Sequence, residues 1–170
     1  KGIYDAMNKG AQLAKGDYVI FMNAGDCFVA PDTLQKIFST PQTADIIYGD
    51  VRKHGKIKSA AHPQNAHRMY FCHQSSFTKT ELLRQKPFDL SHPYSADFKL
   101  FKQLFLQGAS FLYLPLPIAD FDTTGISNSK RSAAIYDNIR VIREVDNLPT
   151  QLRLLPRLFF TYLLLRLRRK

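Results

Sequence analysis

The sequence predicts an α/β fold, and three features of its patterning support that class. Short apolar runs of strand length alternate with longer segments whose apolar residues recur at helical spacing. Gly, Pro and Asp residues mark the boundaries between these segments. The 170 residues, 45% hydrophobic and 22% charged, suffice for one domain with a sizeable core.

The first segments of the chain are expected to be two helices and two strands. A helix over residues 3–15 ends at Gly16, and Tyr18–Met22 is an apolar run typical of a buried parallel strand. A second helix begins near Pro31-Asp32-Thr33 and continues to Phe38, before a strand at Ala44–Tyr48. The residues expected to face the core from the first helix are Ile3, Ala6, Met7, Leu13 and Ala14.

The middle of the chain contains a hairpin pattern and a polar strand. Residues Val51 to Ser59 form the hairpin pattern, with a turn at His54-Gly55. Phe71–Phe77 is interpreted as a strand with polar side chains on one side. Thr80 is expected to cap a short helix from Glu81 to Gln85.

A longer helix is expected to begin at Ser95 or Asp97 and to end at Gly108. Its inward residues at helical spacing are aromatic and aliphatic: Phe98, Phe101, Leu104 and Phe105. We interpret these aromatic residues as part of the hydrophobic core.

The last segments are a strand, a loop and a helix. Ser110–Leu114 is strand-like and is expected to end at the nearby prolines Pro115 and Pro117. Residues 120–130 are rich in Thr, Gly, Ser and Asn and are expected to form a loop. A helix follows from Ser132 to about Val145.

Cysteine and histidine usage gives no metal-ligand pattern. Cys27 and Cys72 are not spaced as a metal knuckle, so a reduced setting without a disulfide is expected. The histidines His54, His62, His67 and His92 are interpreted as surface residues. Nothing resembles a signal peptide, and the chain begins without Met inside an amphipathic segment. We therefore expect an N-terminal part to precede it.

The net charge of +10 is concentrated in the tail, because no acidic residue follows Asp146. An apolar run at Leu158–Leu165 lies between the arginines and is too short to span a bilayer. We therefore expect residues 149–170 to form a basic amphipathic helix on an anionic membrane surface, beside a domain over residues 1–148. The alternative is a helix docked on the domain or on a partner helix.

Asp26 is the residue most indicative of function. It ends the sequence Phe21-Met22-Asn23-Ala24-Gly25-Asp26, directly after an apolar strand. Ligands of α/β sheets bind outside the carboxyl ends of strands, so a carboxylate here suits a ligand or a metal. The alternative is a turn in which Asp26 accepts hydrogen bonds from its own backbone.

Five motifs, in this order, resemble those of family 2 glycosyltransferases with the GT-A fold. They are residues 2–10, residues 21–26, Tyr48-Gly49-Asp50, His73-Gln74-Ser75-Ser76-Phe77 and Ser95-Ala96-Asp97-Phe98. The similarity is greatest to bacterial enzymes that build capsule or exopolysaccharide, colanic-acid-type transferases included. The resemblance implies a Rossmann-like mixed sheet flanked by helices, here without the N-terminal strands and the main pocket for the nucleotide base.

The resemblance also implies roles for particular residues. Asp97 would be the catalytic base, and Asp26 would bind a divalent cation, Mn²⁺ or Mg²⁺. The usual Asp-x-Asp metal motif is here Asn23-Ala24-Gly25-Asp26, with an amide in place of one carboxylate. The donor-binding residues would be Asp5, Asn8, Asn23 and Asp26, and the acceptor-side residues His73, Gln74 and Asp122. The alternatives are a helix-terminal carboxylate for Asp97 and a hydrogen-bonded core histidine for His73.

Three functions remain open at this stage. The first is an inverting transferase that moves a sugar from a nucleotide-sugar, most simply a UDP-sugar, to a lipid-linked or polysaccharide acceptor. Such an enzyme would be cytoplasmic and peripheral on the inner face of the cell membrane. The second is a truncated, inactive fragment of that enzyme. The third is a nucleic-acid-binding module, which is disfavoured because the cations lie in an apolar tail and not in an aromatic-interleaved groove.

Overall fold

A computed structural model describes residues 2–122 and 131–167 of the chain. Six strands form one mixed sheet in the order β1-β5-β3-β6-β2, with β4 paired to β3. Within the described residues, only the central pair β3 and β6 is parallel, and the remaining pairs are antiparallel. The strands are β1 (Tyr18–Val19), β2 (Cys27–Phe28), β3 (Ile46–Lys53), β4 (Lys56–Lys58), β5 (Ser76–Lys79) and β6 (Phe111–Asp120). The predicted α/β class and the mixed sheet are confirmed.

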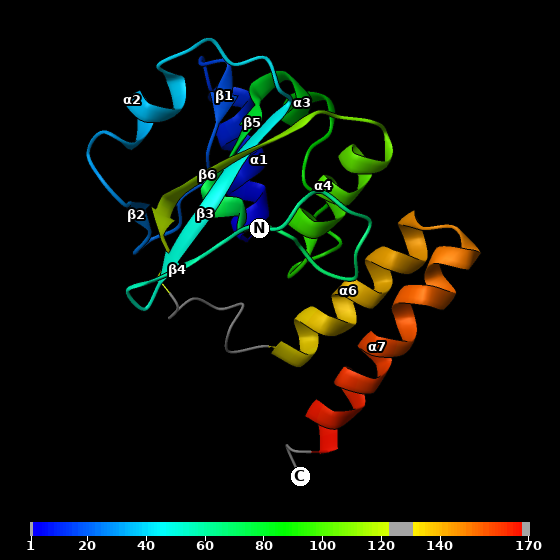
Figure 1. Cartoon of the computed structure of the whole chain (residues 1–170). Coiled ribbons are helices and arrows are strands. Elements are labelled where there is room, and N and C mark those ends of the chain that lie inside the picture. The colour runs from blue at the N-terminus through cyan, green and yellow to red at the C-terminus, as the bar shows by residue number, and fades with distance from the viewer. Residues whose placement is uncertain (1, 123–130, 168–170) are drawn as a thin grey trace.

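Helices cover both faces of this sheet (Figure 1). α1, α3 and α4 pack on one face and α2 on the other. α6 and α7 form an antiparallel pair beside α4, away from the sheet (Figure 1). The helices are α1 (Ile3–Leu13), α2 (Thr33–Phe38), α3 (Thr80–Gln85), α4 (Ala96–Leu106), α6 (Arg131–Val145) and α7 (Leu148–Leu167), with a 3₁₀ turn, η1, at His73–Ser75.

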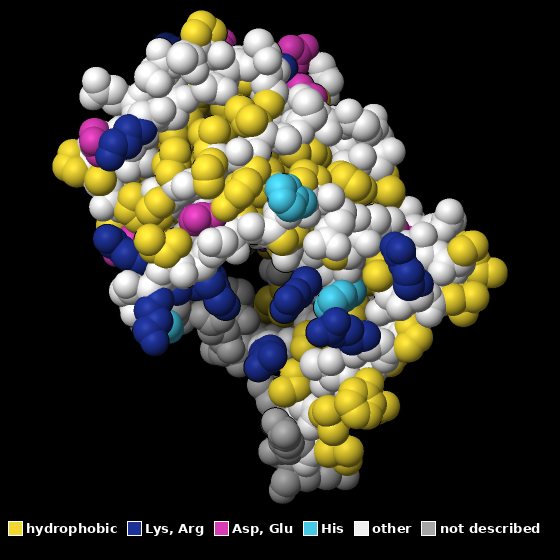
Figure 2. Space-filling model, in the orientation of Figure 1, with side chains coloured by type: hydrophobic (Ala, Val, Ile, Leu, Met, Phe, Trp, Pro, Cys, Tyr) yellow, Lys and Arg dark blue, Asp and Glu magenta, His cyan; other side chains and the backbone are white. Residues whose placement is uncertain are grey.

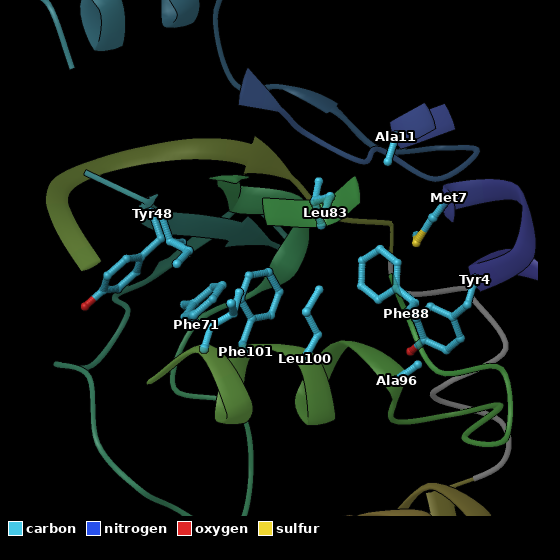
Figure 3. Close-up of a cluster of buried hydrophobic side chains, with 12 residues drawn as sticks. Tyr4, Met7, Ala11, Tyr48, Phe71, Leu83, Phe88, Ala96, Leu100 and Phe101 are labelled. Atoms are coloured by element: carbon cyan, nitrogen blue, oxygen red, sulfur yellow. The ribbon is translucent and has the colours of Figure 1, made fainter. Parts of the chain in front are cut away.

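The main core lies between the sheet and the helices α1, α3 and α4 (Figure 3). Successive side chains of a strand point to opposite faces, so β3 sends Ile46 and Tyr48 into this core and Ile47 into the other. The main core is rich in aromatic rings, which bury large apolar areas. Its residues are Tyr4, Met7, Ala11, Ile46, Tyr48, Phe71, Leu83, Phe88, Ala96, Leu100, Phe101 and Leu104.

A separate apolar cluster attaches the helix pair to α4. Leu154 and Leu158 of α7 are buried against Ile139 and Ile142 of α6, and Phe98 of α4 joins them. The opposite side of α7 leaves large apolar side chains exposed, among them Leu152, Phe159, Phe160, Leu163 and Leu167. No helix within the described residues is long and apolar enough to cross a bilayer. The tail helix is thus docked on the domain through one face only.

The first helix is confirmed, and Met7 faces the core as predicted, but the rest of the predicted inward face is wrong. Tyr4, Met7 and Ala11 are buried, whereas Ile3 and Leu13 are exposed. Ala6 is also exposed, and Ala14 is half-buried. Both sets of residues recur at helical spacing, so the pattern alone could not separate two neighbouring stripes. The Tyr4 ring stacks on Phe88 with centroids 5.4 Å apart, which selects the observed stripe.

Two predicted strands are much shorter in the structure. Only Tyr18–Val19 of the first run is in a strand, and it is half-buried and antiparallel to β5 instead of buried and parallel. In Phe71–Phe77, residues His73–Ser75 form the turn η1, and the strand begins at Ser76. The Thr80 hydroxyl does not cap α3, because it donates to the carbonyl of Gly16.

The prediction that Pro115 and Pro117 end a strand is wrong. β6 continues through both prolines to Asp120, and its register against β3 shifts on either side of Asp50. Such a bulge accommodates proline, which has no N–H to donate to the ladder. The close approach of β6 requires a glycine at position 49, since a Cβ there would lie 2.6 Å from the Leu116 carbonyl oxygen.

The strand predicted at Ala44–Tyr48 is different in the structure, because β3 begins at Ile46 and continues through Gly49 and Asp50 to Lys53, where it forms the first strand of the hairpin. Other local predictions agree with the structure. The hairpin turns at His54 and Gly55, whose φ angles of 50° and 72° fit a tight two-residue turn. α4 ends before Gly108, where φ is 83°. Cys27 and Cys72 are both free thiols. Most of the predicted loop over 120–130 lies outside the described residues.

Candidate active site

A cleft of about 1330 Å³ opens between the sheet and the helix pair. Figure 2 shows this hollow, bordered by Lys and Arg side chains. It is lined by the first turn of α1, the loop after β1, the segment before η1, the start of α4 and the first half of α7. Six of the predicted site residues line it together: Asn23, Asp26, His73, Gln74, Asp97 and Asp122.

Asp97 lies in the first turn of α4 with three hydrogen bonds to its carboxylate. Its Oδ1 accepts from the Tyr4 hydroxyl at 2.9 Å and from the backbone N–H of Phe98 at 2.8 Å. Its Oδ2 lies 3.0 Å from Nδ1 of His73. The side chain is 16% exposed, so it borders the cleft without being open to bulk water.

Two opposing effects act on the pKa of Asp97. Burial raises the pKa, but the hydrogen bonds and charge from His73, with those from Tyr4 and the Phe98 amide, outweigh burial and lower it. The carboxylate is therefore ionised at neutral pH. Burial and the adjacent Asp97 charge raise the pKa of Tyr4 far above its ordinary value, so its hydroxyl keeps the proton that it donates.

A polar network holds the segment before α4 against α6. Asp137 accepts from the backbone N–H of Tyr94 at 3.0 Å and lies 2.9 Å from Nδ1 of His92. The Ser95 hydroxyl donates to Asn138 at 2.6 Å. His92 is fully buried, so its assignment to the surface is wrong. α6 thereby fixes the turn from which Asp97 points.

The loop that carries Asp26 is a tight turn. Its Oδ2 accepts from the backbone N–H of Asn23 at 3.0 Å, and its own N–H donates to the Asn23 carbonyl at 3.0 Å. Its Oδ1 accepts from the backbone N–H of Asp122 at 2.9 Å. Gly25, with φ of 94°, lies against the Asp122 side chain, whose Cβ would be 2.9 Å from a Cβ at position 25. The turn thus brings Asp26 and Asp122 into one corner of the cleft.

Two groups of side chains could hold a cation. Asp26 and Asp122 offer carboxylate oxygens, the ligands that Mg²⁺ and Mn²⁺ prefer, and both line the cleft. Asp89, His92 and Glu144 offer ligand atoms within 4.8 Å of one another outside it. The Lys99 ammonium already lies 2.6 Å from the Asp89 and Glu144 carboxylates, so the second group is neutralised by the chain itself.

His73 and Gln74 lie side by side at the floor of the cleft. Gln74 is buried, and Oε1 of its side-chain amide accepts a hydrogen bond from the Cys72 thiol at 2.9 Å. Burial raises the pKa of Cys72 to about 11, so the thiol stays protonated and does not act as a nucleophile. Nε2 of His73 is shielded from solvent and has no hydrogen-bond partner among the described residues.

Asp5 and Asn8 are not among the residues that line the cleft. Asp5 pairs with Lys9 at 2.9 Å on the α1 surface. The Asn8 amide donates to the carbonyl of Phe88 at 2.9 Å and accepts from its N–H at 2.8 Å. The Asn8 side chain therefore fastens α1 to the segment after α3.

Sequence reasoning missed Tyr4, His92 and Asp137 as residues that build the site. Tyr4 directly follows Ile3, which was predicted to face the core in its place. The contact of Tyr4 with Asp97 joins residues that are 93 positions apart. The carboxylate partners of His92, Asp137 and Glu144, are 45 and 52 residues away. No local spacing in the sequence signals contacts of this range.

Comparison with curated proteins gives a consistent set of relatives. A "PGL/p-HBAD biosynthesis glycosyltransferase" of Mycobacterium bovis BCG is 28% identical over 139 residues, which cover 76% of this chain and 54% of the relative. Its counterpart in Mycobacterium tuberculosis matches equally. An "uncharacterized glycosyltransferase" of Mycobacterium tuberculosis is 28% identical over 155 residues, 82% of this chain and 57% of the relative.

The chain thus spans a little over half the length of these curated relatives. The model of the family described as "Glycosyl transferase family 2" matches residues 1–107, well over half of the chain. That match contains Asn23, Asp26, His73 and Asp97, four residues that the structure gathers in the cleft. The chain belongs to glycosyl transferase family 2.

Proposed function

We propose that this protein catalyses inverting transfer of a sugar from a nucleotide-sugar donor to a lipid-linked or polysaccharide acceptor in cell-surface polysaccharide synthesis. Membership of the family implies a nucleotide-sugar donor and a glycan acceptor. The observation that carries the proposal is an ionised, hydrogen-bonded Asp97 in the same cleft as Asp26 and Asp122. The same cleft thus contains a candidate base, Asp97, and two carboxylates, Asp26 and Asp122, that suit a cation.

Asp97 is proposed as the general base. An acceptor hydroxyl within hydrogen-bond reach of its carboxylate transfers its proton to Asp97 as the oxygen attacks the anomeric carbon. The new C–O bond forms on the face opposite the nucleoside diphosphate, and the bond from the anomeric carbon to the diphosphate oxygen breaks. One displacement inverts the anomeric centre, so one base is sufficient. His73 and Tyr4 keep the base ionised and oriented.

Asp26 is proposed to bind the divalent cation, with Asn23 shaping the turn. Asp122, which the resemblance placed on the acceptor side, is proposed here as a second ligand, because its backbone N–H donates to Asp26 in the same corner. A bound Mg²⁺ or Mn²⁺ supplies positive charge that offsets the charge of the departing diphosphate. Asp26 can accept the backbone hydrogen bonds of its turn and still bind a cation, because each carboxylate oxygen has more than one acceptor site. The donor nucleotide is proposed to be UDP by resemblance to the family.

The tail is proposed to hold the protein on the inner face of the cell membrane. α7 buries one face on α6 and leaves Leu152, Phe160, Leu163 and Leu167 exposed. Exposed apolar side chains flanked by arginines favour the interface of an anionic bilayer. A lipid-linked acceptor would then reach the cleft from the membrane.

The test is cation-dependent hydrolysis of a panel of nucleotide sugars. It compares the chain printed above, the chain extended by any upstream residues that its natural gene encodes, and the Asp26→Asn variant of each. Hydrolysis of one donor by either wild-type form, lost on chelation and in its variant, supports the transferase. Natively folded proteins that neither bind nor hydrolyse any donor would overturn the proposal.

A further inference from the structure

One wall of the cleft is cationic, and the proposed mechanism does not use it. Five basic side chains line the cleft. Lys53 and Lys58 come from the β3–β4 hairpin, whereas Arg68, Arg153 and Arg157 come from the segment before η1 and from α7. The three carboxylates that line the cleft, Asp26, Asp97 and Asp122, belong to the proposed catalytic end. Figure 2 shows Lys and Arg side chains on both sides of the hollow. We call Arg68, Arg153 and Arg157 the cationic wall.

The cationic wall is not neutralised by the protein. Within residues 2–122 and 131–167, none of the five basic side chains of the cleft forms an ion pair with a carboxylate. In the part of the chain that the structure describes, Arg153 donates only to the Asn65 carbonyl, at 3.3 Å, and the Lys53 ammonium lies 3.8 Å above the Phe121 ring. Other cations of the fold, such as Arg52 and Lys102, are paired. Unpaired positive charge in a concave site concentrates the field and attracts anions.

The pKa of a neighbouring histidine, His67, is lowered in part by the same positive charges. His67 lines the cleft beside the cationic wall. Burial lowers its pKa, and the positive charges of Arg157, Arg68 and Lys102 lower it further. These cations converge on one place from α7, from the segment before η1 and from α4.

The arrangement on α7 suits an anion with an apolar tail. Arg153 and Arg157 are one helical turn apart and so share a side of the helix, facing the cleft. At 3.6 residues per turn, the exposed apolar positions Leu152, Phe160 and Leu163 run along the adjoining side. Guanidinium groups match phosphate oxygens with paired hydrogen bonds. α7 thus presents two guanidinium groups that suit a phosphate, next to exposed apolar side chains.

We propose that the cationic wall binds the diphosphate of a lipid-linked acceptor, whose lipid chain follows the exposed apolar side of α7. This inference rests on the proposed function and specifies its acceptor. The reaction then involves two diphosphates, one on the donor and one on the acceptor. The carboxylate corner with its cation serves the donor diphosphate, and the three arginines of the cationic wall serve the acceptor diphosphate.

The experiment is vesicle flotation without donor or turnover. Neutral phosphatidylcholine vesicles carry either a polyprenyl diphosphate or phosphatidylglycerol at matched negative charge. The wild-type chain should prefer the diphosphate vesicles, and Arg153→Gln/Arg157→Gln should weaken that preference about 10- to 100-fold, as expected for two charge-assisted hydrogen bonds. Arg166→Gln is the matched control, because Arg166 is on the same helix but outside the cleft lining, bonded to the Tyr162 hydroxyl at 3.0 Å.

Each outcome decides the inference. Equal binding to both vesicle types, or an unchanged preference in the double variant, would overturn it. Inhibition by free pyrophosphate, together with a preference that persists when the lipid is shortened, would show a phosphate site without a lipid role and overturn the proposed acceptor. Melting curves establish that the variants fold. Diphosphate binding in a protein without transferase activity would contradict the proposed function alone, so the two failures are distinguishable.

Discussion

His73 and Asp97 are joined side chain to side chain, with Nδ1 of the imidazole 3.0 Å from Oδ2 of the carboxylate. An ionised carboxylate can only accept, so Nδ1 carries the proton in this contact. The turn η1 supplies His73 and the first turn of α4 supplies Asp97, and both segments line the cleft. The contact ties the orientation of the candidate base to the segment that forms the floor of the site.

Replacing the candidate base should remove transfer and leave donor binding. Asp97→Asn keeps the side-chain shape but cannot take a proton, so turnover should fall about 10²- to 10⁴-fold. Transfer assays and titration of the donor nucleotide measure the two effects. Asp17→Asn, at an exposed position, is the control. Full activity in Asp97→Asn would show that another group is the base.

Removing a hydrogen bond to Asp97 should move the acid limb of the pH profile upward. Burial raises the pKa of Asp97 and the hydrogen bonds from His73 and Tyr4 lower it, so Tyr4→Phe leaves a higher pKa. The base acts only when unprotonated, so kcat/KM should decline at a higher pH than in the wild type. The comparison is kcat/KM against pH, with Tyr136→Phe, an exposed tyrosine, as control. An unshifted limb in Tyr4→Phe would contradict the role of this hydrogen bond.

The fold class and much of the candidate site could be predicted from the sequence. The helices at 33–38 and 96–106 have clear start signals and periodicity, and the hairpin has a Gly turn. Asp26, His73 and Asp97 were found through motifs, and the structure brings them into one cleft. Helix start signals, periodicity, turns and motifs depend on residues that are close in the chain, and they can therefore be recognised in one sequence alone.

What could not be predicted depends on contacts between distant segments. The inward side of α1 is decided by Phe88 and Asp97, which approach Tyr4 only in the folded chain. The burial of His92 depends on Asp137 and Glu144 from α6. The extension of β6 through its prolines depends on a register shift against β3, which the composition of β6 does not reveal.

Loss of the Asp26 charge should weaken cation binding. Asp26→Asn keeps a carbonyl oxygen but removes a negative charge, so the Mn²⁺ concentration for half-activation should rise about tenfold or more. Mn²⁺ titration followed by electron paramagnetic resonance measures binding without turnover. Glu144→Gln is the matched control, since Glu144 belongs to the other carboxylate group. Loss of binding in Glu144→Gln, with Asp26→Asn unaffected, would place the cation with Asp89 and His92.

Breaking the buried pair between Lys102 and Asp146 should destabilise the junction of the helix pair with α4. Their side chains are 2% and 1% exposed, and Nζ lies 2.8 Å from Oδ2. Asp146→Asn leaves a buried ammonium without its counter-charge, which costs about 3–5 kcal/mol. Denaturant unfolding measures the loss. Asp32→Asn, which breaks the exposed pair with Lys36, should change the free energy of unfolding by less than about 1 kcal/mol. Equal losses of unfolding free energy in Asp146→Asn and Asp32→Asn would mean that the buried pair stabilises the fold no more than the exposed pair does.

A methyl group at Gly49 should disturb both stability and the carboxylate corner. The added Cβ would lie 2.6 Å from the Leu116 carbonyl oxygen and 2.8 Å from the Ile118 side chain, and the backbone oxygen cannot yield without moving β6. Overpacking of this kind costs about 1–3 kcal/mol. β6 leads directly to Asp122, whose backbone N–H holds Asp26, so a displaced β6 should also weaken Mn²⁺ binding. Gly16→Ala is the control, because its Cβ would meet the nearest atom at an ordinary 3.7 Å. A Gly49→Ala protein that loses stability but keeps wild-type Mn²⁺ affinity would show that the corner is held independently of β6.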